Sequence, residues 1–263
     1  MKGLLKMLET SYIDYILQGH ELYWNMLGNI RGIRNHKSDI SWLSGDIDFT
    51  YSILLNDTDY CEQISQIVAR IRSREIPNNL VITPGSAPED IDLLGCFMKT
   101  GLFKTGFTSL GMLKTLAPNT CLPPSEKCLN IFRVNDLQQL KMCGAILTSS
   151  FEYILFTYEH YIDAFHMHHV RFYLAEYNGL PVGACMSILG DEFVEIAWVG
   201  TLVGYRKKGI GGYLVNAAEI DALQLGKSIS VLTASEGAVN AYKRIGYQGY
   251  CNIDTIFLKD GVL

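Results

Sequence analysis

One stretch of the sequence, from Thr201 to Leu214, has the residue types and spacing that suit phosphate binding. It follows an apolar run, Phe193 to Val199, and leads into residues at helical spacing. Its central residues are Arg206, Lys207, Lys208, Gly209, Ile210, Gly211 and Gly212. The first amides of a helix lack internal acceptors and carry partial positive charge, and glycines leave them open to an anion. The stretch predicts a phosphate or pyrophosphate cradle; the simpler alternative is a strand–turn–helix corner with solvated lysines.

Two other phosphate-binding motifs fit this stretch less well. The Gly-x-Gly-Gly run at 209–212 departs from the G-x-G-x-x-G fingerprint of dinucleotide-binding folds, and a long strand-rich segment precedes it. No glycine is followed, after four residues, by Gly-Lys-Ser or Gly-Lys-Thr, so the sequence excludes a P-loop. A dinucleotide-dependent oxidoreductase stays a rival interpretation, but this glycine spacing favours it less.

The motif Arg206-x-x-Gly209-x-Gly211 resembles the R/Q-x-x-G-x-G/A motif of the GNAT N-acetyltransferase superfamily. The resemblance covers roughly residues 126–263. It implies that the cradle holds the pyrophosphate of acetyl-coenzyme A, which is the cosubstrate in that family. It also implies that backbone groups from Val199 to Val203, including Thr201, pair with the pantetheine arm like an added strand.

Glu195 is the candidate general base under this resemblance, because some histone-acetylating members place their base at the same offset from the motif. Strand alternation predicts one face with Glu195, Ala197, Val199 and Thr201, and an opposite, core-facing side with Val194, Ile196 and Trp198. We therefore expect Glu195 to face the less apolar side, where a cleft would lie. Partial burial would raise its pKa toward a range useful for a base. The alternative is a structural glutamate paired with a lysine at a strand end.

Tyr242 is the candidate general acid, because the run from Ala238 through Tyr242 to Gly246-Tyr247 resembles the family's A-x-x-x-Y-x-x-x-G-F pattern. A phenol is protonated at neutral pH and is able to donate to a thiolate. The alternative is an interfacial tyrosine in a chain that has 15 of them. Ser235 stands where the family usually has asparagine, and its shorter side chain puts that contact with pantetheine in doubt.

Four histidines cluster at His160, His166, His168 and His169. Metal binding is one interpretation, but the segment has no H-E-x-x-H pattern and no cysteine at ligand spacing, so we expect no metal. Contact with the acceptor and a purely structural role are the other interpretations. Seven cysteines are scattered without a C-x-x-C pair, and they are typical of small buried residues in a reducing cytoplasm. A disulfide formed on oxidation between Cys121 and Cys128, which flank a probable linker, is a weaker alternative.

The elements that position these residues follow a mixed α/β pattern. The second half reads as strand, two helices, three strands, then helix–strand–helix–strand, which resembles the full GNAT topology. The first half predicts a helix over 1–30 and then a β-α-β-α-β order, with a strand at 47–55 and a helix from Pro88. Phe97-Met-Lys-Thr-Gly101 parallels Tyr242-Lys-Arg-Ile-Gly246, which indicates a weak internal repeat or a coincidence between two ordinary endings. We therefore predict a degenerate GNAT-like domain over 1–124 and a catalytic GNAT domain over 125–263.

Composition limits the functions and partners. Apolar residues make up 48% of the 263 residues and the net charge is −5, which supports a packed core and argues against a nucleic-acid binder. Neither a signal peptide nor a membrane-spanning run is visible, so we expect a cytoplasmic protein without membrane contact. The expected partner is a small-molecule or peptide amine, with a homodimer possible. A non-catalytic acyl-coenzyme A sensor is the alternative function.

Overall fold

The computed structural model describes residues 2–55, 59–117, 128–151 and 156–259 of the chain. The first half forms α1 (Lys2–Leu27), β1 (Ile33–His36), β2 (Ile40–Gly45), β3 (Phe49–Ile53), α2 (Tyr60–Arg72), β4 (Asn79–Ile82), α3 (Leu93–Lys99) and β5 (Phe103–Thr115). The second half forms β6 (Leu129–Arg133), α4 (Leu137–Ser150), α5 (Tyr158–Phe165), β7 (Val170–Tyr177), β8 (Leu180–Leu189), β9 (Phe193–Thr201), the 3₁₀ turn η1 (Val203–Tyr205), α6 (Ile210–Gln224), β10 (Ile229–Ser235), the turn η2 (Glu236–Ala238), α7 (Val239–Arg244) and β11 (Gln248–Leu258). The mixed α/β fold predicted for both halves is confirmed.

Several element boundaries differ from those that the sequence predicts. Strands β1 and β2 were not predicted, and with β3 they form a separate antiparallel three-stranded sheet. The helix predicted from Pro88 begins only at Leu93, because the Asp92 side chain caps it through the amide of Gly95. The second helical region predicted at 150–166 is shorter, since α5 begins after Thr157.

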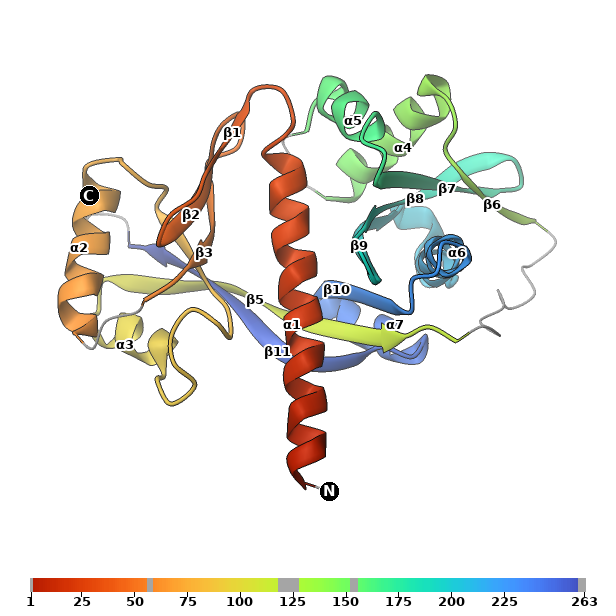
Figure 1. The fold of residues 1–263 in the computed structure, drawn as a ribbon. Coiled ribbons are helices and arrows are strands. Elements are labelled where there is room, and N and C mark those ends of the chain that lie inside the picture. The colour runs from red at the N-terminus through yellow and green to blue at the C-terminus, as the bar shows by residue number, and fades with distance from the viewer. Residues whose placement is uncertain (1, 56–58, 118–127, 152–155, 260–263) are drawn as a thin grey trace.

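An eight-stranded sheet runs through both halves in the order β4-β11-β5-β10-β9-β8-β7-β6. Strand β5 comes from the first half but pairs with β10 over seven positions, from Ile229↔Thr115 to Ser235↔Ser109. Strand β11 comes from the second half but pairs with β4. Figure 1 shows β5 and β11 lying side by side and crossing between the two parts of the molecule. The division at 124/125 stays a prediction; residues 118–127, with Cys121, lie outside the described residues.

Helix α1 crosses the middle of this sheet, in front of β10 and β5 in Figure 1. Along its length Tyr15 contacts the ring of Phe193 at the start of β9, and Tyr23 contacts the ring of Trp198 near its end. The helix therefore runs alongside β9 and covers one face of the strand that carries the candidate base. Helices α4 and α5 cover the same face farther along, and α6 packs on the opposite face.

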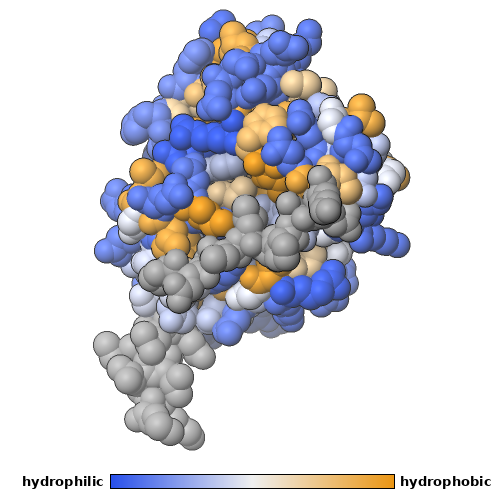
Figure 2. Space-filling model, turned by 90° about the vertical axis from the view of Figure 1, so that its right-hand side faces the viewer, coloured by the Kyte–Doolittle hydropathy of each residue, from blue (hydrophilic) through white to orange (hydrophobic). Residues whose placement is uncertain are grey.

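Within the described residues, no helix is both long enough and apolar enough to cross a membrane. Figure 2 views the molecule from the right-hand side of Figure 1 and shows hydrophilic residues over most of this face. Hydrophobic residues gather there in smaller groups that hydrophilic ones separate. The possible homodimer stays a prediction.

Candidate functional site

Strands β9 and β10 separate from one another beside the predicted site. They pair in parallel over three positions only, Ile229↔Phe193, Ser230↔Val194 and Val231↔Glu195. Beyond this point β9 pairs only with β8, and β10 pairs only with β5. The backbone of β9 from residue 196 to residue 201 therefore lacks a strand partner on the β10 side. We call this divergence the splay; its closed end lies at Glu195.

The start of α6 lies just past the open end of the splay. Gly209 is the N-cap residue and has a left-handed backbone, with φ of +76°, which glycine adopts without steric cost. No side chain caps this helix, and its first turn contains no acidic residue. Among the described residues, no carbonyl accepts from the amides of residues 207–212. Six backbone donors are thus left open at the positive end of a helix, as the glycine pattern predicts.

Two of the glycines allow close packing around this turn. A Cβ at Gly211 would lie 3.4 Å from Cγ1 of Val199 on β9, and a Cβ at Gly212 would lie 3.3 Å from Cγ2 of Ile245. The first turn of α6 is therefore held against both the edge of β9 and the segment that follows α7. A Cβ at Gly211 would make an ordinary van der Waals contact with Val199, whereas one at Gly212 would require Ile245 to move slightly.

The cations next to this turn differ in their contacts. Arg206 is exposed, and its Nε donates a 3.0 Å hydrogen bond to the Thr201 carbonyl, which fixes the side chain at the end of β9. The ammonium of Lys208 lies 4.6 Å from the centre of the Tyr177 ring, within the range of a cation–π contact. Lys207 is exposed and has a left-handed backbone, with φ of 64°. The positive charge near the cradle thus comes from all three side chains.

Glu195 lies on the face of β9 opposite Val194 and Ile196, as alternation predicts, but the predicted faces fail after Ala197. Trp198 and Val199 together oppose Cys185 of β8, which is a β-bulge, and Trp198 has a left-handed backbone with φ of 50°. The extra residue places Trp198 on the same face as Ala197, toward α4 and α5, and returns Val199 to the α6 face. The expected grouping of Glu195 with Val199 and Thr201 was therefore wrong.

The surroundings of Glu195 also differ from the cleft that the sequence predicts beside it. Its side chain is 4% exposed and packs directly against α1, since a Cβ at Gly19 would lie 2.5 Å from its Oε2 atom. No described residue donates a hydrogen bond to the carboxyl group. Burial raises its pKa well above the ordinary value, in the direction expected of a base but with more complete desolvation. Burial therefore disfavours the ionised form of this carboxyl group.

Tyr242 lies on α7, partly buried against the core beneath α6. Its ring packs edge-on against Tyr247 at 5.9 Å between centres. Burial raises its pKa, with smaller contributions from Cys185 and Glu195, so the phenol is protonated at neutral pH. The effect of Glu195 places the two candidate groups in one electrostatic environment. The Tyr242 hydroxyl bonds to none of the described residues and keeps its proton available.

The other predicted contact residues flank the splay. Ser235 ends β10 and is exposed, on the strand opposite the unpaired edge of β9. Val203 is 74% exposed, which is unusual for a large apolar side chain, and lies in η1 between Thr201 and the cradle. Ile210 is buried beneath the first turn of α6, so only its backbone faces the cradle.

The histidine cluster does not converge on one point. His160 is buried; its Nδ1 accepts from the amide of Thr157, and its Nε2 bonds to Asp46 after β2 at 3.0 Å, so it joins the two halves. His166 and His168 are exposed, and His169 has a pKa lowered by burial and by His168. Among the described residues, no group of His, Cys, Asp or Glu is arranged to hold a metal ion.

Sequence reasoning missed two sets of residues around the site. Gly19 of α1 leaves room for the Glu195 side chain. A glycine inside a helix destabilises it by about 1 kcal/mol relative to alanine, so its place in a helical pattern was the sequence signal for a close contact. Lys114 of β5 forms a buried 2.6 Å ion pair with Glu219 of α6, and nothing in the local sequence links these two positions.

Comparison with known proteins gives a consistent result. Residues 139–247 match the model described as the acetyltransferase (GNAT) family. No protein of curated function matches the sequence.

Solved structures extend the likeness beyond that segment. A GCN5-related N-acetyltransferase from Kribbella flavida has a TM-score of 0.66 and 16% identity, over 93% of this chain and 96% of its own. Another from Sphaerobacter thermophilus has a TM-score of 0.63 and 14% identity, over 83% and 79%. A tandem GNAT protein from the clavulanic acid biosynthesis pathway has a TM-score of 0.59 and 9% identity, over 82% and 77%. At such identities the likeness is one of fold, and it includes both halves of the chain.

Proposed function

We propose, on the premise that residues 139–247 match the GNAT acetyltransferase family, that the protein is an acetyl-coenzyme A-dependent N-acetyltransferase. It transfers the acetyl group directly to a primary amine while both substrates are bound. One observation carries the proposal: the splay between β9 and β10 has uncapped helix amides at its open end and a buried carboxyl group at its closed end. That arrangement suits an elongated molecule with a diphosphate at one end and a reacting group at the other.

In this proposal the diphosphate binds at the first turn of α6. The amides from Gly209 to Gly212 donate to its oxygens, and Arg206, Lys207 and Lys208 supply the balancing charge. The pantetheine arm then lies along the unpaired edge of β9, where backbone groups of Val199, Thr201 and Val203 take the place of a strand partner. Ser235 reaches it from β10.

The chemistry uses Glu195 at the closed end of the splay and Tyr242 on α7, whose pKa is raised by burial and, to a smaller extent, by Cys185 and Glu195. The acceptor amine loses a proton to Glu195, directly or through a water molecule, and attacks the thioester carbonyl carbon. A backbone amide of β9 stabilises the negative charge that develops on the carbonyl oxygen. The carbon–sulfur bond then breaks, and Tyr242 donates its proton to the departing thiolate. The products are an N-acetylated amine and coenzyme A.

The acceptor would approach along α1, on the face of β9 that carries Glu195. Aromatic side chains from both halves meet there: the Trp198 indole donates a 2.9 Å hydrogen bond to the Tyr23 hydroxyl, and its ring lies 4.3 Å from that of Phe156. The first half, proposed as a degenerate GNAT-like domain over 1–124, thus supplies a wall of the acceptor site. A small-molecule or peptide amine and a cytoplasmic location remain parts of the proposal.

The test is acetyl transfer to a panel of polyamines, aminoglycosides, amino acids and peptides, followed by release of free thiol. We expect amine-dependent release by the wild type. Tyr242→Phe should lower kcat at least tenfold with little change in acetyl-coenzyme A affinity, because the missing proton donor acts only in the transition state. Equal loss of both would contradict its role as an acid. Coenzyme binding without transfer to any amine would favour the non-catalytic sensor instead.

A further inference from the structure

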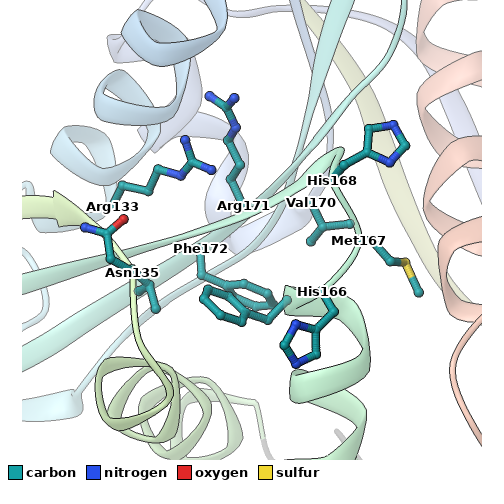
Figure 3. Close-up of a pocket in the computed structure, with 10 residues that line it drawn as sticks. Arg133, Asn135, His166, Met167, His168, Val170, Arg171 and Phe172 are labelled. Atoms are coloured by element: carbon teal, nitrogen blue, oxygen red, sulfur yellow. The ribbon is translucent and has the colours of Figure 1, made fainter.

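A cavity of about 220 Å³ lies on the edge of the large sheet, away from the splay, where β6 ends and β7 begins. Its polar lining consists of Arg133, Asn135, His166, His168 and Arg171, and its apolar side includes Phe172 (Figure 3). Among the described residues, no carboxylate lines it. The cavity is therefore surrounded by hydrogen-bond donors and positive charge, without a negative group of its own.

Arg171 is the buried member of this group, with its side chain only 10% exposed. Its Nη1 atom pairs with Asp221 of α6, and the Tyr173 hydroxyl donates to the same carboxylate oxygen at 2.7 Å. Its Nε atom is buried and has no hydrogen-bond acceptor among the described residues. Burying a guanidinium N–H without an acceptor costs folding free energy. The position of this N–H beside a cavity therefore indicates that a ligand supplies the acceptor.

Arg133 brings a second guanidinium group to the same place. It faces Tyr173 across the β6–β7 pair, so it lies on the same sheet face as Arg171, two residues along. Figure 3 shows its guanidinium group directed toward that of Arg171. Arg133 is exposed and forms neither an ion pair nor a hydrogen bond with the described residues. Of the two guanidinium groups, only that of Arg171 is paired with a carboxylate, Asp221, and the positive charge of Arg133 has no counter-charge among the described residues.

We propose that this cavity binds a compact oxyanion, a carboxylate or phosphate group of a small metabolite. The fork of Arg133 and the orphaned Nε of Arg171 donate to its oxygens, which is the geometry that guanidinium groups offer to such anions. Asn135, just past the end of β6, supplies a further amide donor to the cavity. The volume suits one anionic group with a few carbon atoms. This site is separate from the cradle at α6 and does not depend on the acetyltransferase proposal.

The test follows the Nε–H NMR signal of Arg171 during titration with inorganic phosphate and, separately, with succinate, at constant ionic strength. Gly211→Asp serves as the background, because it blocks the cradle, which would bind phosphate itself. We expect this signal to shift and saturate with at least one probe. The tighter probe then identifies the anion as a phosphate or a carboxylate.

Matched variants decide whether the cavity is responsible. Arg133→Gln should weaken binding at least tenfold, because it removes one of the two guanidinium groups but not the Arg171–Asp221 pair. Arg34→Gln, which removes an exposed arginine on β1, should leave the affinity unchanged. An Arg171 signal that moves with neither probe overturns the proposal. So does equal affinity in Arg133→Gln and Arg34→Gln, which would mean nonspecific charge attraction.

Discussion

Glu195 shows how a single residue joins stability and function in this protein. It is an ionisable side chain on a central strand, largely covered by α1 and left without a donor among the described residues. Burial of this kind disfavours the charged form, and that same effect makes the ionised group a stronger base. The fold therefore gives up stability at this position in a way that the proposed reaction uses.

Glu195→Gln should stabilise the protein at alkaline pH. In the unfolded chain Glu195 ionises above a pKa of about 4.3, whereas its pKa in the folded protein is raised. The wild type consequently loses roughly 1.4 kcal/mol of unfolding free energy for each pH unit between those two values, and glutamine does not. We expect a higher Tm for the variant at pH 8 and equal Tm values below pH 4.

Thermal unfolding across this pH range checks the prediction, with Glu236→Gln as a control. Glu236 is exposed, so its substitution should not change the pH dependence. If Glu195→Gln follows the wild-type curve at every pH, the carboxyl group is not desolvated and the proposed base has an ordinary pKa.

At the scale of elements, helix α6 depends on a strand from the other half of the chain. Glu219 of α6 is fully buried, and its Oε2 atom pairs at 2.6 Å with Lys114 of β5, whose side chain is 15% exposed. Nearby, the hydroxyls of Ser230 on β10 and Tyr247 before β11 share a 2.5 Å hydrogen bond. The orientation of the helix that begins at the cradle is thus fixed partly by a cation from the first half.

Lys114→Met should destabilise the fold by about 3 kcal/mol, because it leaves Glu219 buried without a counter-charge. The double variant Lys114→Met with Glu219→Met removes both charges and should recover most of that loss, to within about 1 kcal/mol of the wild type. Denaturant unfolding measures both. Equal stability of the single and double variants would show that the pair contributes nothing specific to the position of α6.

The sequence was sufficient where the determinants are local. The glycines and cations at 206–212 specify a turn and a helix start within one short segment, and the structure places them there. The faces of Trp198 and Val199 were mispredicted because strict alternation does not allow for the bulge at Trp198, which no neighbouring residue signals. Strands β1 and β2 were missed because Arg34-Asn35 and Ser41-Trp42 blur the expected alternation of apolar and polar residues.

At the scale of the whole molecule, the two halves exchange their last strands. Helix α3 precedes β5 as α7 precedes β11, and the glycines that follow the two helices, Gly101 and Gly246, both have positive φ. Each last strand pairs with a strand of the opposite half, and the two pair with each other at the centre (Figure 1). The predicted internal repeat agrees with this arrangement, whereas the exchange itself arises from long-range pairing that local sequence does not report.

Residues 128–263 alone should therefore fail to fold. Without the first half, β10 loses its β5 partner and β11 loses partners on both sides. Co-expression with residues 1–117 should restore a folded complex that co-purifies, because the exchanged strands hold the two pieces together. Circular dichroism and co-purification measure the outcome. Cooperative unfolding of the isolated second half would contradict the exchange and support an independent domain beginning near residue 125.

The central claim is that the first turn of α6 binds the diphosphate of acetyl-coenzyme A, and calorimetric titration of Gly211→Asp tests it most directly. A carboxylate at a helix start suits the fold but repels a phosphate, so binding should be lost while Tm is unchanged or higher. Gln138→Asp, the same charge change in the first turn of α4, should bind as the wild type does. Unchanged affinity of the stably folded Gly211→Asp protein would contradict the account.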